Sequence, residues 1–205
     1  MLYEPTTLAN VARLIGDTLD KDYGIDPAPI FAQANIDTSK FQRPGARIPL
    51  SRMTRLWDLA VYMTDDQQFG LKAGARAEPS DFYVLGHAWL ASATLKGGLE
   101  RLCRYAHVLS TAITRAEVVE EDGMVVFVES FPDPEIVINR TASEAGIVAF
   151  FKLCETVRRE RVRPLRAELI FPADTARDYL DEFLDCPVSY GTEREKFYFS
   201  RQLFE

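Results

Sequence analysis

RIPLSRMTRLWDLAVYMTDDQQFGLKAGARAEPSDFYVLGHAWLASATLKGGLERLCRYAHVLS, residues 47–110, is the stretch that says most about the fold of this chain. Its apolar residues recur at spacings of three and four, which is typical of helices with one buried face. The pattern predicts helices at about 51–64, 66–74, 80–92 and 95–109. Ser80 and Thr94 stand where the last two helices need an N-cap. The buried stripe predicted for the last helix is Leu95, Leu99, Leu102, Ala106 and Leu109.

The residues before this stretch are also helical by pattern. Thr6 or Thr7 is the predicted cap of a helix whose apolar positions run from Leu8 to Leu19. Asp26 followed by Pro27 predicts the start of a second, short helix, since proline suits the first helical position. Residues 37–45 are polar and contain Pro44-Gly45, so a loop is expected there.

After Ser110 the period of the sequence changes to that of strands. Residues 112–121 and 124–131 predict a β-hairpin around Glu121-Asp122-Gly123. A long helix is expected at 143–162 and is ended by Pro164, followed by a strand at 166–172 and a helix at 175–184. Residues 188–191 and 196–200 supply one or two more strands.

These elements predict an α+β fold in which a helical N-terminal half packs on a small antiparallel or mixed sheet with covering helices. The order in the C-terminal half is ββαβαβ. We expect one domain over residues 1–205, with a helical half at 1–110 and a sheet-containing half at 111–205.

The charge balance limits the partners that this chain can have. Residues 1–110 carry 12 basic and 12 acidic residues, and residues 111–205 carry 12 and 19, which gives the net charge of −7. An acidic domain repels a phosphate backbone, so we do not expect these residues to bind DNA by themselves.

No apolar run reaches the roughly 18 residues that a membrane span needs, and no signal peptide is visible. Cys103, Cys154 and Cys186 lack any CxxC spacing, so reduced thiols and a cytoplasmic location are expected.

Motifs for catalysis, metals and cofactors are missing. His87 and His107 are the two histidines, and their spacing does not match a zinc motif. There is no GxSxG or GxxxxGK[ST] sequence, and Gly70 to Gly74 lies in a helical pattern, unlike a dinucleotide fingerprint. We therefore expect no enzyme, no cofactor and no metal.

Two basic or helical features have alternative interpretations. Residues 30–56 superficially resemble a helix-turn-helix, but Pro44-Gly45 breaks the second helix and no surplus of basic residues surrounds it. The arginines at 158, 159, 161 and 163 either complement the negative end of the long helix or contact another domain or DNA.

Several motifs in residues 47–110 resemble the effector-sensing half of AraC-type bacterial transcription regulators, in the subtype called arabinose-binding-like. A second block near the end of the chain carries the same resemblance. The similar residues are RIPL (47–50), RLW (55–57), FGL (69–71) with Gly74, Leu85-Gly86, SATLKGGLERLCRYAHVL (92–109), CPVSYG (186–191) and Phe197 to Phe204.

The resemblance implies a regulatory domain that senses a small-molecule effector, such as an amino-acid derivative, a fatty acid or a sugar. It also implies a homodimer, and DNA binding only through a C-terminal helix-turn-helix domain that lies outside these 205 residues. The alternative in the same family is a scaffold that dimerises or autoinhibits without any ligand. An enzyme with an unseen site is a third, more distant hypothesis.

A binding pocket needs apolar walls and a few convergent polar groups. The matched block offers aromatic candidates together with His87, Arg101 and Arg104. Arg104 suits a carboxylate on an effector, although a helix salt bridge to Glu100 is an equal alternative, and most of the aromatics are also candidates for the core. The predicted ligand-binding residues are Trp57, Tyr62, Phe82, Tyr83, His87, Arg101, Arg104 and Tyr105.

Overall fold

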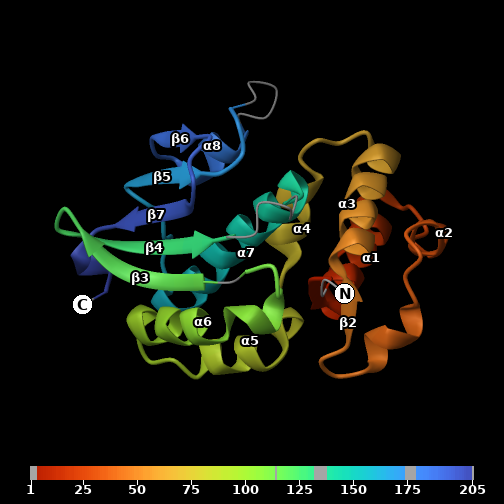
Figure 1. The fold of residues 1–205 in the computed structure, drawn as a ribbon, viewed down its shortest axis with the longest axis horizontal. Helices are drawn as coiled ribbons and strands as arrows, with labels where there is room; N and C mark the ends of the chain where they lie inside the picture. Colours follow the sequence, from red (N-terminus) through yellow and green to blue (C-terminus); the bar gives the residue numbers. More distant parts are fainter. Residues whose placement is uncertain (1–3, 114, 132–137, 174–178, 205) are drawn as a thin grey trace.

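The computed structural model describes residues 4–113, 115–131, 138–173 and 179–204. Figure 1 shows the first helices of the chain on one side of a long helix and a sheet on its other side, with the helices of residues 83–109 below the sheet. The helical half contains α1 (Ala9–Tyr23), α2 (Ala28–Gln33), η1 (Thr38–Gln42), α3 (Leu50–Thr64), α4 (Phe69–Arg76), η2 (Pro79–Phe82), α5 (Tyr83–Leu90) and α6 (Leu95–Leu109). The predicted α+β class is confirmed.

A five-stranded sheet forms the other half. Its strand order is β3-β4-β7-β5-β6, from β3 (Arg115–Glu121), β4 (Met124–Ser130), β5 (Arg166–Leu169), β6 (Val188–Tyr190) and β7 (Glu195–Phe199). The sheet is mixed, because β5 and β6 are parallel and the other pairs are antiparallel. The remaining helices are α7 (Arg140–Arg158), α8 (Tyr179–Leu184) and the short η4 (Arg201–Leu203).

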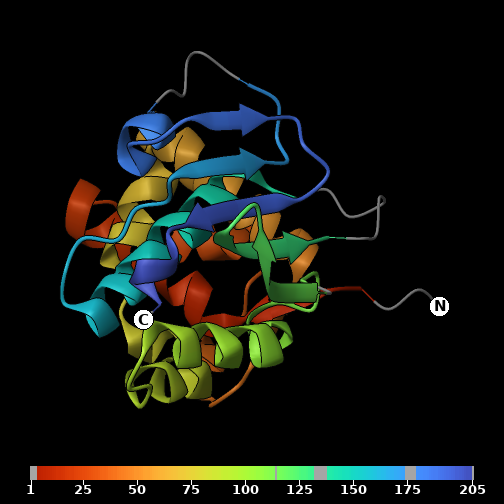
Figure 2. The same ribbon diagram turned by 90° about the vertical axis from the view of Figure 1, so that its left-hand side faces the viewer.

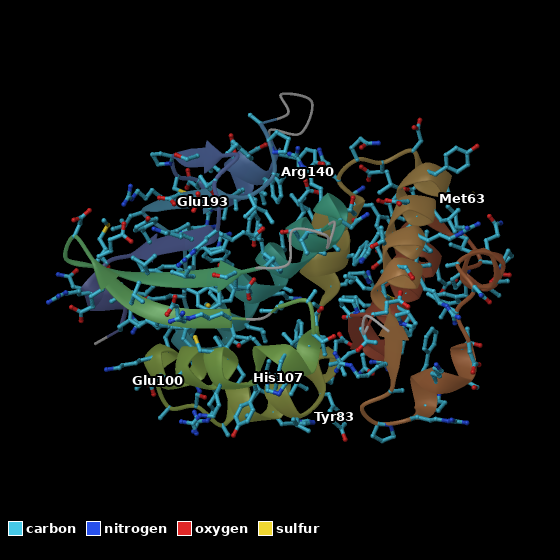
Figure 3. The ribbon with its side chains drawn as sticks, in the orientation of Figure 1. Met63, Tyr83, Glu100, His107, Arg140 and Glu193 are labelled. Carbon is cyan, nitrogen blue, oxygen red and sulfur yellow. The ribbon has the colours of Figure 1, made fainter. Side chains whose placement is uncertain are left out.

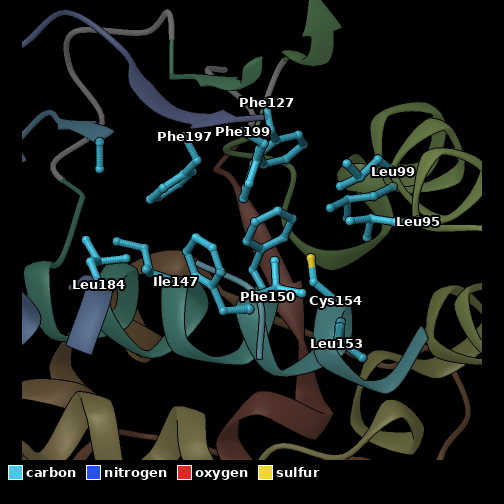
Figure 4. Close-up of a cluster of buried hydrophobic side chains, with 14 of the residues drawn as sticks. Leu95, Leu99, Phe127, Ile147, Phe150, Leu153, Cys154, Leu184, Phe197 and Phe199 are labelled. Atoms are coloured by element: carbon cyan, nitrogen blue, oxygen red, sulfur yellow. The ribbon is translucent and has the colours of Figure 1, made fainter. Parts of the chain in front are cut away.

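One face of the sheet packs against α7 through aromatic rings (Figure 4). Phe150 stacks on Phe127 with ring centroids 4.7 Å apart, and Phe151 meets Phe197 edge to face at 5.3 Å. Offset stacking and edge-to-face contact are the favoured geometries of aromatic pairs. Helix α6 contacts β3, so that α5 and α6 lie together beside the hairpin (Figure 2).

Glycines allow α4 to approach α7 closely. A Cβ on Gly70 would lie 2.5 Å from the carbonyl oxygen of Thr141, and one on Gly74 would lie 2.5 Å from that of Ala145. The spacing of four residues places both glycines on one face of α4. These glycines in the predicted helical pattern therefore serve helix packing and join the two halves.

The start of the chain differs from the prediction. Thr6 and Thr7 belong to strand β1 (Thr6–Leu8), which pairs with β2 (Arg47–Pro49), and neither caps α1. The hydroxyl of Thr7 donates to the carbonyl oxygen of Leu109 at 3.0 Å. Non-local pairing with residues 47–49 fixes this segment, and local propensity could not indicate it.

Three further boundaries differ. Residues 79–82 form a 3-10 turn with a capping box between Glu78 and Asp81, so Ser80 is not the cap that we predicted. Helix α7 ends at Arg158, where Arg159 adopts a left-handed conformation, well before Pro164. The loop at 37–45 contains η1. The cap at Thr94 is confirmed, since its hydroxyl accepts from the amide of Gly97.

Candidate functional site

A cavity of about 240 Å³ lies where the helical half meets the sheet, and we call it the junction cavity. Its walls come from β1, α1, α3 and α6 on one side, from β4 and β7 on the other, and from α7 between them. This volume is close to the lower end of small-molecule sites, which begins at about 300 Å³. Small side chains on α7 leave this space open: Ala142, Ala145, Gly146 and Ala149.

The lining is almost entirely apolar. Helix α3 contributes one face to it, with Leu50, Met53 and Trp57, and α6 contributes Leu102 and Leu109. Among the described residues that line the cavity, none is Lys, Arg or His. An apolar chamber of this kind favours a ligand with a hydrophobic body.

Two carboxylates interrupt the apolar lining, and we call Glu129 and Glu195 the carboxylate pair. They are directly opposite each other in the β4–β7 ladder and face α7, on the same side of the sheet as Phe127 and Phe197. Side chains of opposed residues on one face of a sheet lie about 5 Å apart at Cβ. The pair therefore places two acids together at one wall of the cavity.

The two acids differ in their contacts. Glu195 is 2% exposed and accepts a hydrogen bond from the hydroxyl of Ser143 on α7, at 2.7 Å. Glu129 is half-buried and lines the cavity. In the described part of the chain, no donor bonds to the carboxylate of Glu129.

Burial dominates the acid–base behaviour of the pair. It raises the pKa of Glu129 to about 8, with a further contribution from the negative charge of Glu195. Burial also raises the pKa of Glu195 to about 7, against the opposing effect of the Ser143 hydrogen bond. Near neutral pH the pair thus holds roughly one to two protons, because charging it in an apolar site without a counter-ion is unfavourable.

Two of the eight predicted ligand-binding residues line this cavity. Trp57 is 3% exposed and projects from α3, and Phe82 lies at the end of η2. Both were predicted as aromatic walls, and the structure brings them to one chamber.

The other six lie elsewhere. Tyr62 is 81% exposed near the end of α3, next to the Met63 labelled in Figure 3, and Tyr83 packs near Gly45. Arg101 donates to the hydroxyl of Ser92 and to the carbonyl oxygen of Gly97, so it links α6 to the turn between α5 and α6. The remaining three are exposed on α5 and α6: His87, Arg104 and Tyr105. Ligand contact by these residues stays a prediction.

Sequence reasoning missed the carboxylate pair. Glu129 alternates with Phe127 and Phe131, and Glu195 alternates with Phe197 and Phe199, so each acid occupies an inward position of an apolar strand. That period of two is a usable signal for a buried carboxylate. The meeting of the two acids depends on the pairing of β4 with β7, which the sequence does not indicate.

Within the described ranges, no group of three or more His, Cys, Asp or Glu residues is arranged to hold a metal ion. None of the helices in those ranges is long and apolar enough to cross a membrane.

The fold and the site together define a class: an α+β domain with an apolar cavity at the junction of a helical half and a mixed sheet. A family model described as the arabinose-binding domain of AraC transcription regulator, N-terminal, matches residues 24–205. The chain therefore belongs to this family of regulator domains.

Two relatives illustrate the family. The ornithine utilization regulator of Pseudomonas aeruginosa is 25% identical over 165 residues, which are 79% of this chain and 48% of that protein. The crystal structure of the transcriptional regulator CdpR from Pseudomonas aeruginosa matches with a TM-score of 0.57 and 16% identity, over 100% of this chain and 57% of that one. This chain thus spans about half the length of each relative, and the CdpR likeness concerns the fold alone.

Proposed function

We propose that this chain is the effector-sensing part of a cytoplasmic transcription regulator and that the junction cavity binds the effector. The observation that supports this most is the position of the cavity, which is walled by both halves of a domain from a regulator family. A ligand there contacts α1 and α3 as well as β4 and β7, so it favours one arrangement of the halves over another. A ligand shifts such an equilibrium only by its differential affinity for the two states.

In this proposal the domain carries no catalytic activity, and DNA is bound by a separate C-terminal domain of the full-length regulator. Homodimer formation is part of the same proposal and is measured by analytical ultracentrifugation, with and without ligand. The relative is named for ornithine utilization, so ornithine belongs in the ligand panel beside amines, fatty acids and sugars.

The test is a thermal-shift screen of the 205-residue chain against that panel. A ligand at about 100 times its dissociation constant stabilises the folded state by roughly 2.7 kcal/mol, which raises Tm by about 5–10 °C at this size. The matched variants are Gly146→Leu and Gly146→Ala, because Gly146 lines the cavity and an added Cβ there meets nothing within 4 Å. Gly146 is exposed at the cavity wall, so leucine adds bulk at the open side of the cavity and should abolish the shift, and alanine should keep it.

Two more variants test the residues outside the cavity. If the junction cavity is the site, His87→Ala and Arg104→Ala keep the ligand shift, since both side chains are exposed on α5 and α6. Loss of the shift in these variants but not in Gly146→Leu would move the site to that surface. A flat screen with every ligand class would favour the ligand-independent scaffold.

A further inference from the structure

Carboxylates on the outer face of the sheet have cationic partners. Lys196 contacts Glu121 at 3.1 Å and Glu168 at 3.9 Å, and the guanidinium of Arg166 lies over the ring of Tyr198 at 3.7 Å. On α7, the buried Glu144 pairs with Arg140 at 2.8 Å. Each of these three acids, Glu121, Glu168 and Glu144, therefore has a cation beside it.

The carboxylate pair on the inner face differs from these three acids. Neither Glu129 nor Glu195 forms a salt bridge with a described residue, and the described cavity lining contains no basic side chain. A buried carboxylate without a counter-ion is strongly unfavourable, and two side by side are worse. In the free protein, protons held by the pair offset this cost, because burial raises the pKa of both groups. An ammonium group can take the place of these protons, which points to a cationic ligand.

We propose that the effector is an organic amine whose ammonium group binds between Glu129 and Glu195, with its hydrophobic part in the junction cavity. This inference rests on the proposed function and names the chemical class of its ligand. A primary ammonium has three donors. It can satisfy the open acceptor of Glu129 and the free oxygen of Glu195 while Ser143 keeps its own bond to Glu195.

The same lining argues against an amino acid. The α-carboxylate of an amino acid needs a cation or a cluster of donors, and the described walls around the pair offer neither an arginine nor a lysine. Buried unpaired carboxylates are costly. An aliphatic or aromatic amine without a carboxylate therefore fits better than ornithine itself.

The raised pKa values of the carboxylate pair predict a second measurable property of amine binding, the release of protons. Raised pKa values of about 8 for Glu129 and about 7 for Glu195 mean that the free pair is largely protonated at pH 7. Binding of an ammonium group requires the charged carboxylates, so the pair releases protons to the buffer as the complex forms. Among the described residues, the groups that face the pair are Ser143 on α7 and the Cys103 thiol on α6. The pKa of Cys103 is raised to about 12, mainly by burial and then by Glu129, so this thiol does not titrate near pH 7.

The experiment is isothermal titration calorimetry of the 205-residue chain with compounds of matched skeleton. The compounds are the straight-chain amines from butylamine to octylamine and 2-phenylethylamine, each compared with its alcohol and its carboxylate. We expect the best amine to bind at least 10-fold more tightly than its alcohol, since charge-assisted hydrogen bonds are stronger than neutral ones. Titrations in two buffers of different ionisation enthalpy should show net proton release at pH 7, and amine affinity should rise between pH 6 and pH 8.

The variants are Glu129→Gln and Glu195→Gln, with Glu121→Gln as the control on the outer face, where Glu121 pairs with Lys196. The first two should lower the preference for amine over alcohol by 10-fold or more and keep alcohol affinity. The control should behave as the unaltered chain. Circular dichroism and unfolding curves establish that each variant is folded, because glutamine keeps the size of a protonated glutamate.

The outcomes separate this inference from the proposed function. Alcohols that bind as tightly as amines, with loss of both in Gly146→Leu, would leave the cavity as a ligand site and overturn the amine. Tighter binding of carboxylates would also overturn it. If no compound of the series binds to the chain, the amine proposal is wrong. The wider thermal-shift panel then decides whether the cavity binds any effector.

Discussion

Arg47 ties together three segments that are distant in the sequence. Its guanidinium donates to the hydroxyl and the carbonyl oxygen of Thr6 and to the carbonyl oxygen of Val108, at 2.6, 2.9 and 2.7 Å. The planar fork of arginine reaches all three acceptors at once, which a lysine ammonium on a flexible stem does not. The first arginine of the RIPL motif therefore holds β1 against β2 and the end of α6.

Replacement of this arginine tests that role. Arg47→Lys should lower the free energy of unfolding by about 1–3 kcal/mol, since hydrogen bonds to a charged donor are worth about that much. Urea unfolding followed by circular dichroism measures it. Arg55→Lys, at an exposed position of α3, is the matched control and should change stability by less than about 0.5 kcal/mol. Equal effects of the two substitutions would contradict the role of Arg47.

Glu129 makes the stability of the free domain depend on pH. Its folded-state pKa of about 8 lies above the ordinary value of 4.5, so its favourable contribution is fully present below the ordinary value and is lost as the pH rises toward 8. Glu129→Gln should remove much of this loss and stabilise the domain at pH 8.5 by up to about 5 kcal/mol, because each unit between the ordinary pKa and the folded-state pKa corresponds to about 1.4 kcal/mol. The gain should shrink toward zero at pH 5.

Unfolding curves between pH 5 and pH 8.5 measure this difference, without ligand. A Glu129→Gln domain that loses stability with pH as steeply as the unaltered chain would mean that the carboxylate is not held in an unfavourable environment. Glu121→Gln serves as the control, because the pKa of Glu121 is lowered, mainly by its hydrogen bond with Lys196.

At the scale of elements, α4 packs closely on α7 through its glycines. Gly74→Ala would place a methyl group 2.5 Å from the carbonyl oxygen of Ala145 and 2.8 Å from the Cβ of Val148. The helices must then separate, and we expect a loss of about 2 kcal/mol or more, as for other overpacked cores. Gly146→Ala on the facing helix should instead stabilise by about 0.5–1 kcal/mol, since its Cβ enters open space and alanine favours a helix. Thermal and urea unfolding of both variants measure the difference, and equal signs would contradict the packing argument.

Local patterns predicted most of these elements. The buried stripe of α6 and the β3–β4 hairpin follow from periodicity and from the Glu121-Asp122-Gly123 turn, whose Asp122 and Gly123 have positive φ. The errors fall where distant segments decide the outcome. Thr6 and Thr7 form a strand because residues 47–49 and 109–111 supply their partners.

The site was harder to predict than the fold for the same reason. Trp57 and Phe82 were identified from their residue type and their place in the matched block, and both line the cavity. The remaining predicted residues are aromatic or basic but occupy surfaces or turns, because periodicity indicates the buried face of a helix and does not indicate which residues border a cavity. Glu129 and Glu195 are 66 positions apart in the chain and meet only through the ladder between β4 and β7.

At the scale of the whole molecule, the junction cavity has walls that belong to both halves. Trp89 adds a further link, since its indole nitrogen donates to the carbonyl oxygen of Leu153 on α7 at 2.8 Å and so joins α5 to the helix that lines the cavity. A ligand in the cavity is therefore in contact with elements that pack against almost every other part of the domain. This arrangement suits a sensor, because a ligand that contacts both halves can couple its binding to how the halves pack on each other.

Hydrogen exchange tests that coupling directly. A ligand found in the screen should slow amide exchange in α3 and α7 and in the paired strands β4 and β7 together, since it contacts all four and stabilises the state in which they are packed. Protection should be weak in α2, which contributes no residue to the cavity. The measurement is exchange followed by mass spectrometry, with Gly146→Leu as the control in which the same compound gives no protection. Protection limited to α3, with no change in β4 and β7, would mean that the ligand binds the helical half alone and that the two halves are not coupled through the cavity.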